Sequence, residues 1–405
     1  MTTFAPILTQ PSVPGVRSTP LPVVLAFTAL NALGSGLVTS GLYFAASSRY
    51  GFGLAENYAL GLLVGVTYTF GALGSSRVVD RSRGRSRAVL AGILAVLALA
   101  TQWPVLLGGS SAAPWLVVLC YCPSVAMLWP IVQSHVTGGR RGTALRSAVG
   151  QFNFTWGVAL AFGFAVIGPS LERTPELLLS ALGGLHLATL LLLFAFVRAP
   201  AEARSAPLAT PEARDLEMRR VMQRLLPLTN VLAFALAPFL PEAFAALGLP
   251  SASRATCAVA WLLPRAIVFG LLARWHGWHG RYATAAVGAG TLIGGFAFAM
   301  LAPWIDRGTL GLALELIGLA AFGVGMATVY TAALYYAQCV GGSAVGAGGR
   351  HEALLGAGAT VGPLFGLSVA VLVEADLLPT GSLEPVLVGA CVLLAAGFVV
   401  RALRR

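Results

Sequence analysis

Long apolar runs alternate with short polar connections along almost the whole chain. Each run has roughly the 20 residues that an α-helix needs to cross the hydrocarbon of a bilayer. Because lipid offers no hydrogen-bond partners to a free backbone, runs of this length predict transmembrane helices. The twelve predicted spans are 22–47, 56–75, 88–108, 114–136, 145–168, 176–197, 226–248, 252–273, 283–304, 309–337, 353–374 and 384–402. The expected fold class is therefore an all-α membrane protein with twelve transmembrane helices.

One polar stretch, from residue 198 to residue 224, interrupts this pattern and leaves six predicted spans on each side. The two halves resemble each other weakly, since a basic, glycine-containing turn follows the second span of each half. Such similarity is typical of transporters built from repeated six-helix units. We expect a disordered cytoplasmic tail at 1–20, an N-terminal six-helix bundle at 21–198, a cytoplasmic linker at 199–224 and a pseudo-symmetric C-terminal six-helix bundle at 225–405.

The charge pattern orients the predicted spans. The net charge is +11, and all 26 basic residues are arginine. Most of them lie in the loops that follow the even-numbered spans, and few lie in the alternate loops. Because positive residues favour the cytoplasmic side, this predicts a multi-pass protein of the cytoplasmic (inner) membrane with both termini in the cytoplasm. The same arrangement explains the basic charge without a nucleic-acid partner.

Composition and missing motifs exclude other classes of protein. Apolar residues make up 57% of the chain and charged residues only 10%, against roughly 25% charged in a soluble domain. The five cysteines lie in or beside apolar runs, at spacings that fit neither a disulfide framework nor a zinc site. No Walker A loop, paired metal-ligand spacing or serine nucleophile elbow occurs in the sequence. We expect no metal, no cofactor and no catalytic residue.

The connection between the second and third spans carries a recognisable motif. It runs from Ser76 through Asp80 and Arg81 to Gly84 and Arg85. This resembles the Gly-x-x-x-Asp-Arg-x-Gly-Arg-Arg motif that the major facilitator superfamily has at the same place, with serine replacing the first glycine and one additional residue before Gly84. The resemblance covers about residues 21–403 and implies two six-helix bundles that transport solutes. It also implies that Asp80, Arg81 and Arg85 form a gating motif that latches the bundles together.

Glycines four residues apart support the same resemblance. In the eleventh span, Gly-x-x-x-Gly-Pro-x-x-Gly resembles a run that the family has in that helix. Glycines at this spacing make flat helix faces on which two backbones approach closely. The candidate faces are Gly61/Gly65, Gly290/Gly294 and Gly358/Gly362/Gly366.

Arg265 lies near the middle of the eighth predicted span. A charge at that depth is costly and is usually paired or in contact with water. Trp261 lies one helical turn earlier, within reach of a cation–π contact. Two interpretations stay open. Arg265 is a structural counter-ion for Glu315 or Glu242, or it faces a central cavity and binds a substrate carboxylate or phosphate.

Glu315 and Glu242 are also the candidates for proton coupling, which requires a membrane carboxyl group whose protonation depends on its access to either side. Both lie toward the outer ends of their spans. Glu352 directly precedes the eleventh predicted span and is expected to be a helix N-terminal charge. In the N-terminal half, Glu56 and Glu176 are the first residues of their predicted spans and no acid lies deeper in a span, so the sequence leaves proton coupling open.

Neutral polar residues mark the expected interior of the bundles. Asn31, Ser35 and Thr39 lie on one face of the first span, because residues four apart stack along a helix. Polar side chains in lipid turn toward protein or water, so such a face predicts a binding surface. Together with Arg265, the expected substrate-binding residues are Asn31, Ser35, Asn153, Trp156 and Tyr330.

The sequence favours a secondary active transporter of a small organic solute, embedded in the lipid bilayer as a monomer and working by alternating access. Two alternatives remain. One is a polytopic membrane enzyme acting on a lipid-linked substrate, although the acids of the external loops are scattered and form no motif. The other is a non-transporting sensor or assembly protein with a transporter fold. The substrate, the direction of transport and the coupling ion are not encoded in any recognisable motif.

Overall fold

The computed structural model describes residues 18–140, 142–200, 213–275, 277–341 and 345–403. Within these ranges the chain is helical and has no β-strand. Most of the expected tail at 1–20 and the middle of the expected linker at 199–224 lie outside the described residues.

Helices fill both halves of the chain. The N-terminal half contains α1 (Leu21–Arg49), α2 (Leu54–Arg81), α3 (Ser86–Ala100), α4 (Trp103–Leu106), α5 (Ala112–Thr137), α6 (Gly142–Phe162), the π-helical η1 (Gly163–Ile167), α7 (Gly168–Arg173), α8 (Pro175–Ala188) and the 3₁₀-helical η2 (Thr189–Ala195). The C-terminal half contains α9 (Ala213–Leu236), α10 (Leu240–Ala246), α11 (Ser251–Cys257), α12 (Val259–Arg274), α13 (Tyr282–Ile305), α14 (Thr309–Gly341), α15 (Val345–Glu374) and α16 (Leu383–Leu403).

These helices combine into membrane spans. Within the described ranges, eleven spans are long and apolar enough to cross a bilayer, and the pair α9–α10, bent by 47°, makes a twelfth. The bend falls at Pro238, where proline removes a backbone donor and breaks the helix. The predicted all-α, twelve-span architecture is confirmed, and the chain is a multi-pass membrane protein.

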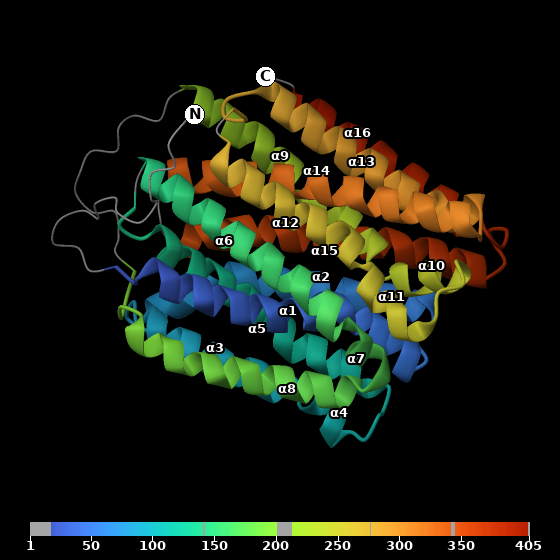
Figure 1. Ribbon diagram of the computed structural model, residues 1–405, viewed down its shortest axis with the longest axis horizontal. Helices are drawn as coiled ribbons and strands as arrows, with labels where there is room; N and C mark the ends of the chain where they lie inside the picture. The colour runs from blue at the N-terminus through green and yellow to red at the C-terminus, as the bar shows by residue number, and fades with distance from the viewer. Residues whose placement is uncertain (1–17, 141, 201–212, 276, 342–344, 404–405) are drawn as a thin grey trace.

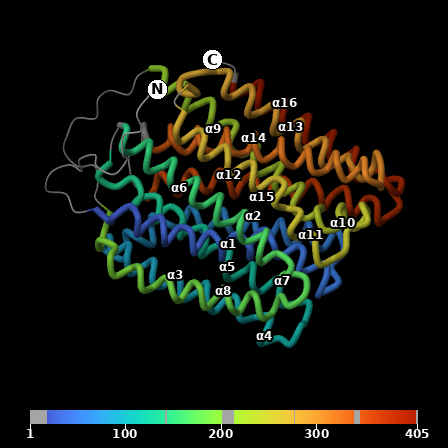
Figure 2. Tube along the Cα trace, viewed as in Figure 1, coloured from blue at the N-terminus to red at the C-terminus, as the bar shows by residue number. Residues whose placement is uncertain are grey.

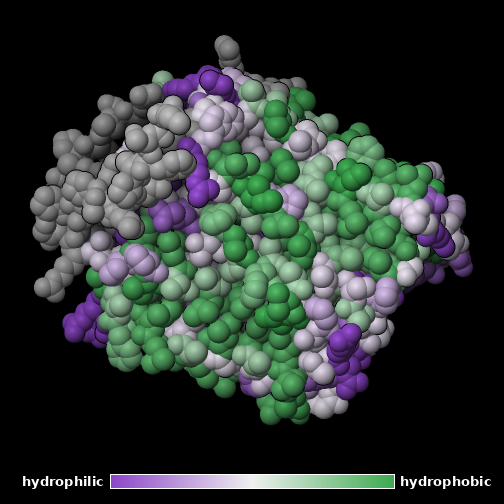
Figure 3. Space-filling model, in the orientation of Figure 1, coloured by the Kyte–Doolittle hydropathy of each residue, from purple (hydrophilic) through white to green (hydrophobic). Residues whose placement is uncertain are grey.

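The spans form two bundles that lie side by side with their helices roughly parallel (Figure 1). Helices α1 to α8, blue to green, make one bundle, and α9 to α16, olive to red, make the other, as the trace in Figure 2 also shows. An apolar surface covers the middle of the helices, and polar residues gather toward their ends (Figure 3). Phe194, for example, is 82% exposed, as a side chain facing lipid would be.

The most extensive contacts between the bundles are those of α2 with α15 and of α6 with α12. Both depend on glycine. A Cβ at Gly65 of α2 would lie 2.3 Å from the carbonyl oxygen of Ala359 on α15. A Cβ at Gly157 of α6 would lie 2.9 Å from the Phe269 ring on α12. Only a residue without a side chain allows such an approach, so glycine sets the contact distance between the bundles.

The described residues near two of the expected domain boundaries are ordered parts of the bundles. Helix α9 begins at Ala213, so residues 213–224 of the expected linker are helical and continue directly into the seventh span. Met218, Val221 and Met222 are buried there, which explains why the helix continues. At the other boundary, the Thr19 side chain is buried and hydrogen-bonded to Nδ1 of His135. Thr19 is therefore packed against the bundle.

The start of the eleventh span also differs from the prediction. Helix α15 begins at Val345, eight residues before the expected position 353. Its first turns pack on the N-terminal bundle through Gly348, against Pro130 and Gln133, and through Gly349, against Ser75. Because these contacts extend the helix, Glu352 lies inside it. The expectation that Glu352 is a helix N-terminal charge is wrong.

Candidate functional site

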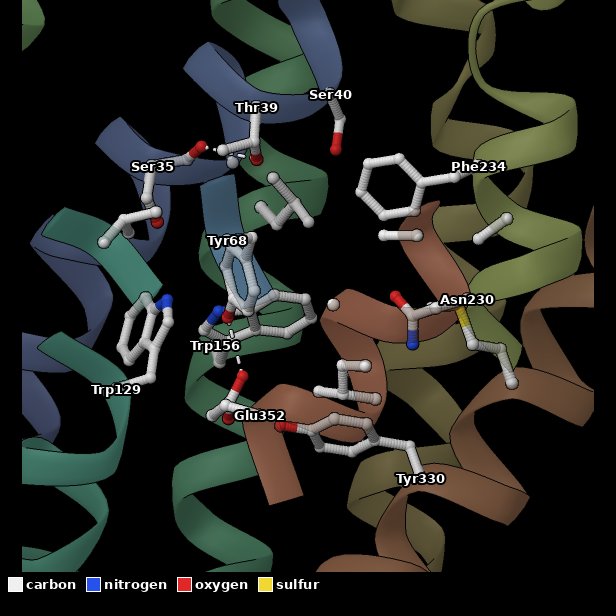
Figure 4. A pocket seen from close by; sticks show the side chains of 18 of the residues that line it. Ser35, Thr39, Ser40, Tyr68, Trp129, Trp156, Asn230, Phe234, Tyr330 and Glu352 are labelled. Atoms are coloured by element: carbon white, nitrogen blue, oxygen red, sulfur yellow. Dashed lines mark hydrogen bonds between the residues drawn. The ribbon is translucent and has the colours of Figure 1, made fainter. Parts of the chain in front are cut away.

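A cavity of about 130 Å³ lies between the two bundles. Four helices of each bundle line it, namely α1, α2, α5 and α6 from the first and α9, α12, α14 and α15 from the second. Figure 4 shows side chains from both bundles pointing into this space. The cavity is therefore positioned so that any movement of one bundle against the other changes it.

Arg265 of α12 is the cationic residue of the cavity wall. Its guanidinium carbon lies 4.5 Å from the ring centroid of Trp156 and 4.7 Å from that of Trp261. The contact with Trp261 was expected from the sequence, and the contact with Trp156 comes from the other bundle. Both indole rings fix the guanidinium and partly offset the cost of burying its charge.

The hydrogen-bonding capacity of Arg265 is largely unused. Nη1 lies 3.5 Å from Sδ of Met326, and Nε and Nη2 have no partner in the described part of the chain. Only 2% of the residue is exposed. A buried guanidinium with free donors is costly unless an acceptor reaches it. The geometry therefore favours an anionic ligand with paired oxygens, which a guanidinium binds in two-point fashion.

The acidic residue of the cavity wall is Glu352 of α15, which the sequence placed wrongly. Tyr68 of α2 donates a 2.6 Å hydrogen bond to Oε2, and Nε2 of Gln133 on α5 donates a 2.6 Å hydrogen bond to Oε1. Both donors belong to the other bundle. The Tyr330 hydroxyl points toward this carboxyl group (Figure 4). Glu352 is thus saturated by protein donors, whereas Arg265 is not.

Neutral polar and aromatic groups complete the wall. Ser35, Thr39 and Ser40 of α1 face Asn230 and Phe234 of α9 across the cavity (Figure 4). Aromatic rings from α5, α6, α12 and α14 supply apolar area, among them Trp129, Phe152, Phe269 and Tyr330. Of the expected substrate-binding residues, the structure places Arg265, Ser35, Trp156 and Tyr330 around one cavity.

Asn31, which the sequence places among the substrate-binding residues, does not line this cavity. Its Oδ1 lies 2.8 Å from Nδ1 of His186, and its Nδ2 donates to Oγ1 of Thr189 and to the Phe27 carbonyl. His186 also bonds the Tyr121 hydroxyl. The amide is therefore held inside the N-terminal bundle, where a buried polar group needs such partners.

Asn153, another expected substrate-binding residue, is also not among the residues that line the cavity. Its neighbours Phe152 and Trp156 occupy the part of α6 that lines the space. Asn153 itself is buried, and its amide has no partner within the described ranges.

The two expected counter-ions of Arg265 do not reach it. Glu315 is completely buried, and neither of its carboxyl oxygens has a hydrogen-bond partner among the residues described. Glu242 is exposed near the start of α10. Neither acid lines the cavity. The counter-ion interpretation of Arg265 therefore does not fit this structure, because the guanidinium contacts indole rings and a thioether instead of a carboxylate.

The gating motif lies on the surface. Asp80, Arg81 and Arg85 are exposed, and no hydrogen bond or ion pair joins them to the C-terminal bundle within the described residues. The latch implied by the family resemblance is not formed in this structure. Two other polar contacts connect the bundles toward this end, Glu352 with its donors and Arg146 with the Tyr335 hydroxyl.

Comparison with known proteins places this geometry in context. No protein-family model and no curated protein matches the sequence, but solved structures match along nearly its whole length. The nucleoside transporter NupG aligns with a TM-score of 0.67 at 12% identity, covering 95% of this chain and 99% of that one. A bacterial homologue of the human lysosomal transporter Spinster, inward-facing and unoccupied, aligns at 0.66 and 14%, covering 94% and 96%. The human organic anion transporter MFSD10 aligns at 0.61 and 18%, covering 94% and 98%.

The TM-scores establish a common fold. At sequence identities this low, the function has to be argued from the site itself. The overall helix arrangement of the described chain agrees with that of these structures. The protein therefore has the twelve-helix fold of the major facilitator superfamily.

Proposed function

We propose that this protein is a secondary transporter that carries a small organic anion across the cytoplasmic membrane by alternating access. The observation that carries the proposal is Arg265, a buried guanidinium with unused donors in a cavity between two bundles. We assign the chain no catalytic role.

The charge balance of the cavity supports an anionic substrate. Glu352 already accepts two hydrogen bonds from the protein, so it offers little to a cationic ligand. Arg265 has two nitrogen atoms free. A carboxylate or phosphate would satisfy those donors and remove the cost of an unpaired buried charge.

The origin of the two indole rings supports a mechanism in which the bundles move. Trp156 belongs to the N-terminal bundle, whereas Trp261 and Arg265 belong to the C-terminal bundle. An anion bound at Arg265 would therefore contact both bundles and favour the arrangement in which they close around it. The volume of about 130 Å³ suits a compact solute in this conformation.

The arginine distribution supports the orientation. Loops rich in arginine connect the same ends of the helices at which α1 begins and α16 ends (Figure 1). Because such loops favour the cytoplasmic side, we place this arginine-rich end, and with it both termini, in the cytoplasm.

Four compounds that share one benzene ring and differ in charge test whether the substrate is an anion. Detergent-purified protein is heated with benzoate, phenyl phosphate, benzyl alcohol or benzylamine at millimolar concentration. We expect the two anions to raise the midpoint of thermal unfolding, because ligands that bind only the folded state stabilise it. The neutral and cationic analogues should leave the midpoint unchanged.

Variants of the cavity arginine link the effect to the site. Arg265→Gln should abolish the stabilisation by anions, and Arg265→Lys should retain only part of it, since lysine lacks the two-point geometry. Arg254→Gln removes an arginine outside the cavity and serves as the matched control. Equal stabilisation by all four compounds, none by either anion, or an undiminished effect in Arg265→Gln would contradict the proposal.

A further inference from the structure

We propose that Glu352 is a proton-binding latch that holds the two bundles together at the arginine-rich end of the cavity. The contacts of Glu352 support the latch itself. Only the coupling of proton movement to solute movement rests on the proposed transport function. The latch is defined as Glu352 with its two donors, Tyr68 and Gln133.

The latch crosses the interface between the bundles. Glu352 belongs to α15, Tyr68 to α2 and Gln133 to α5, and both hydrogen bonds measure 2.6 Å. Only 2% of Glu352 is exposed. If α15 moves away from α2 and α5, both bonds break and the carboxyl group meets water.

The same three side chains satisfy Glu352 whether or not it carries a proton. As a carboxylate it accepts from Tyr68 and Gln133. As a neutral acid it must donate one bond and therefore needs an acceptor. Oε1 of Gln133 is buried without a partner in the described structure. A turn of the Gln133 amide brings this oxygen to the acid proton, while Tyr68 continues to donate.

Among the residues that the structure describes, no arginine or histidine forms an ion pair with Glu352. Tyr330 of α14 and the adjacent His351 of α15 are the other titratable groups beside it, and their rings lie 5.4 Å apart. Arg265 of α12 lines the same cavity without an ion pair to Glu352. Helix α9 contributes the uncharged Asn230 to the cavity, and α16 contributes no residue.

The sign of the proton effect follows from desolvation. Burying a carboxylate without a cation is costly, whereas a neutral acid with its hydrogen bonds is much less so. Proton binding therefore favours the closed latch, and opening into water favours proton release. In a transporter that opens alternately to the two sides, a group with this behaviour couples proton movement to solute movement.

A disulfide between the bundles measures latch closure directly. Position 76 lies on α2 and position 346 on α15, and a Cβ at Gly346 would lie 3.9 Å from the Cβ of Ser76. This is close to the Cβ separation of a natural disulfide. Ser76→Cys and Gly346→Cys are introduced after the five native cysteines are replaced by alanine, and the rate of oxidative cross-linking is measured against pH.

Glu352→Gln in the same background separates the latch from thiol chemistry. Glutamine has nearly the same shape as glutamate and cannot ionise. The cross-linking rate of the Glu352→Gln variant therefore changes with pH only through ionisation of the two introduced thiols. The ratio of the parent rate to the Glu352→Gln rate should be close to one at about pH 5 and fall at least about twofold by about pH 8. Glu315→Gln, which neutralises another buried carboxyl group, is the matched control and should leave this fall unchanged.

Three results would overturn the proposal, two of them from the comparison of the parent with Glu352→Gln. One is a ratio that stays constant with pH, and the other is a fall that Glu315→Gln abolishes. Tyr68→Phe keeps the acid and removes one donor, so it should shift the pH at which the ratio falls; an unchanged pH would also contradict the latch. Cross-linking needs no transported solute, so it tests the latch even if no anion stabilises the protein. In the same way, stabilisation by anions tests the substrate class even if the latch is absent.

Discussion

Arg265 and Glu352 line the same cavity but differ in what the protein supplies to them. The guanidinium of Arg265 has indole rings on two sides and keeps unused donors. The carboxyl group of Glu352 has its acceptors filled by Tyr68 and Gln133. We infer that the first residue contacts the solute and the second responds to the position of the bundles.

The sequence predicts one of these residues and misplaces the other. Arg265 is recognisable because a charge inside a long apolar run is rarely accidental. Glu352 follows Gly348, Gly349, Arg350 and His351, a composition typical of a loop, and only contacts with the other bundle show that it is helical. Trp156 was expected in the cavity, but its position over Arg265 depends on how the two bundles meet.

Asn31 gives a prediction about stability at this scale. Asn31→Leu removes the partner of His186 and Thr189, so it leaves buried polar groups unsatisfied. The expected cost is about 1–3 kcal/mol, measured as a lower midpoint of thermal unfolding in detergent. Stabilisation by benzoate should persist in this variant, since Asn31 lies outside the cavity. An unchanged midpoint, or loss of the benzoate effect alone, would argue for a cavity role instead.

At the scale of helices, glycine decides how α2 and α15 meet. Gly65 packs on Ala359, and Gly356 packs on Thr69 in the opposite direction. The spacing of Gly61 and Gly65 predicts a flat face, and the structure places both at this contact. The same spacing at Gly290 and Gly294 also predicts a close contact, and this prediction is wrong, because no atom of the described residues lies within 4 Å of a Cβ at either position. Spacing alone cannot tell which side of a helix meets protein and which meets lipid.

Two glycines of α2 provide a matched test of this contact. Gly65→Ala places a methyl group 2.3 Å from a backbone oxygen, so α2 and α15 must separate. We expect a lower thermal unfolding midpoint and slower cross-linking of positions 76 and 346. Gly74→Ala meets no atom within 4 Å and should be neutral or slightly stabilising, because alanine favours helix. Equal behaviour of the two variants would show that this contact does not control the bundles.

At the scale of the whole molecule, the sequence predicts the architecture more securely than the site. Apolar runs of membrane length and their division by one polar stretch are properties of the chain itself, and the spans follow from them. The cavity is formed by helices that are distant in sequence, so its members depend on helix rotation and on contacts between the bundles. This is why Ser35 is found in the cavity while Asn31, one turn earlier on α1, is held by His186.

The central claim is that the cavity opens alternately to the two sides of the membrane. A single cysteine at Ser35 in a cysteine-free background tests it in sealed vesicles, with a membrane-impermeant thiol reagent added to one side at a time. Val38 lies one turn away in the packed core of the N-terminal bundle, and only 1% of its surface is exposed. Val38→Cys therefore serves as the control. We predict that Ser35→Cys reacts from both sides and that Val38→Cys reacts from neither. Reaction of Ser35→Cys from one side only, or from neither, would contradict alternating access.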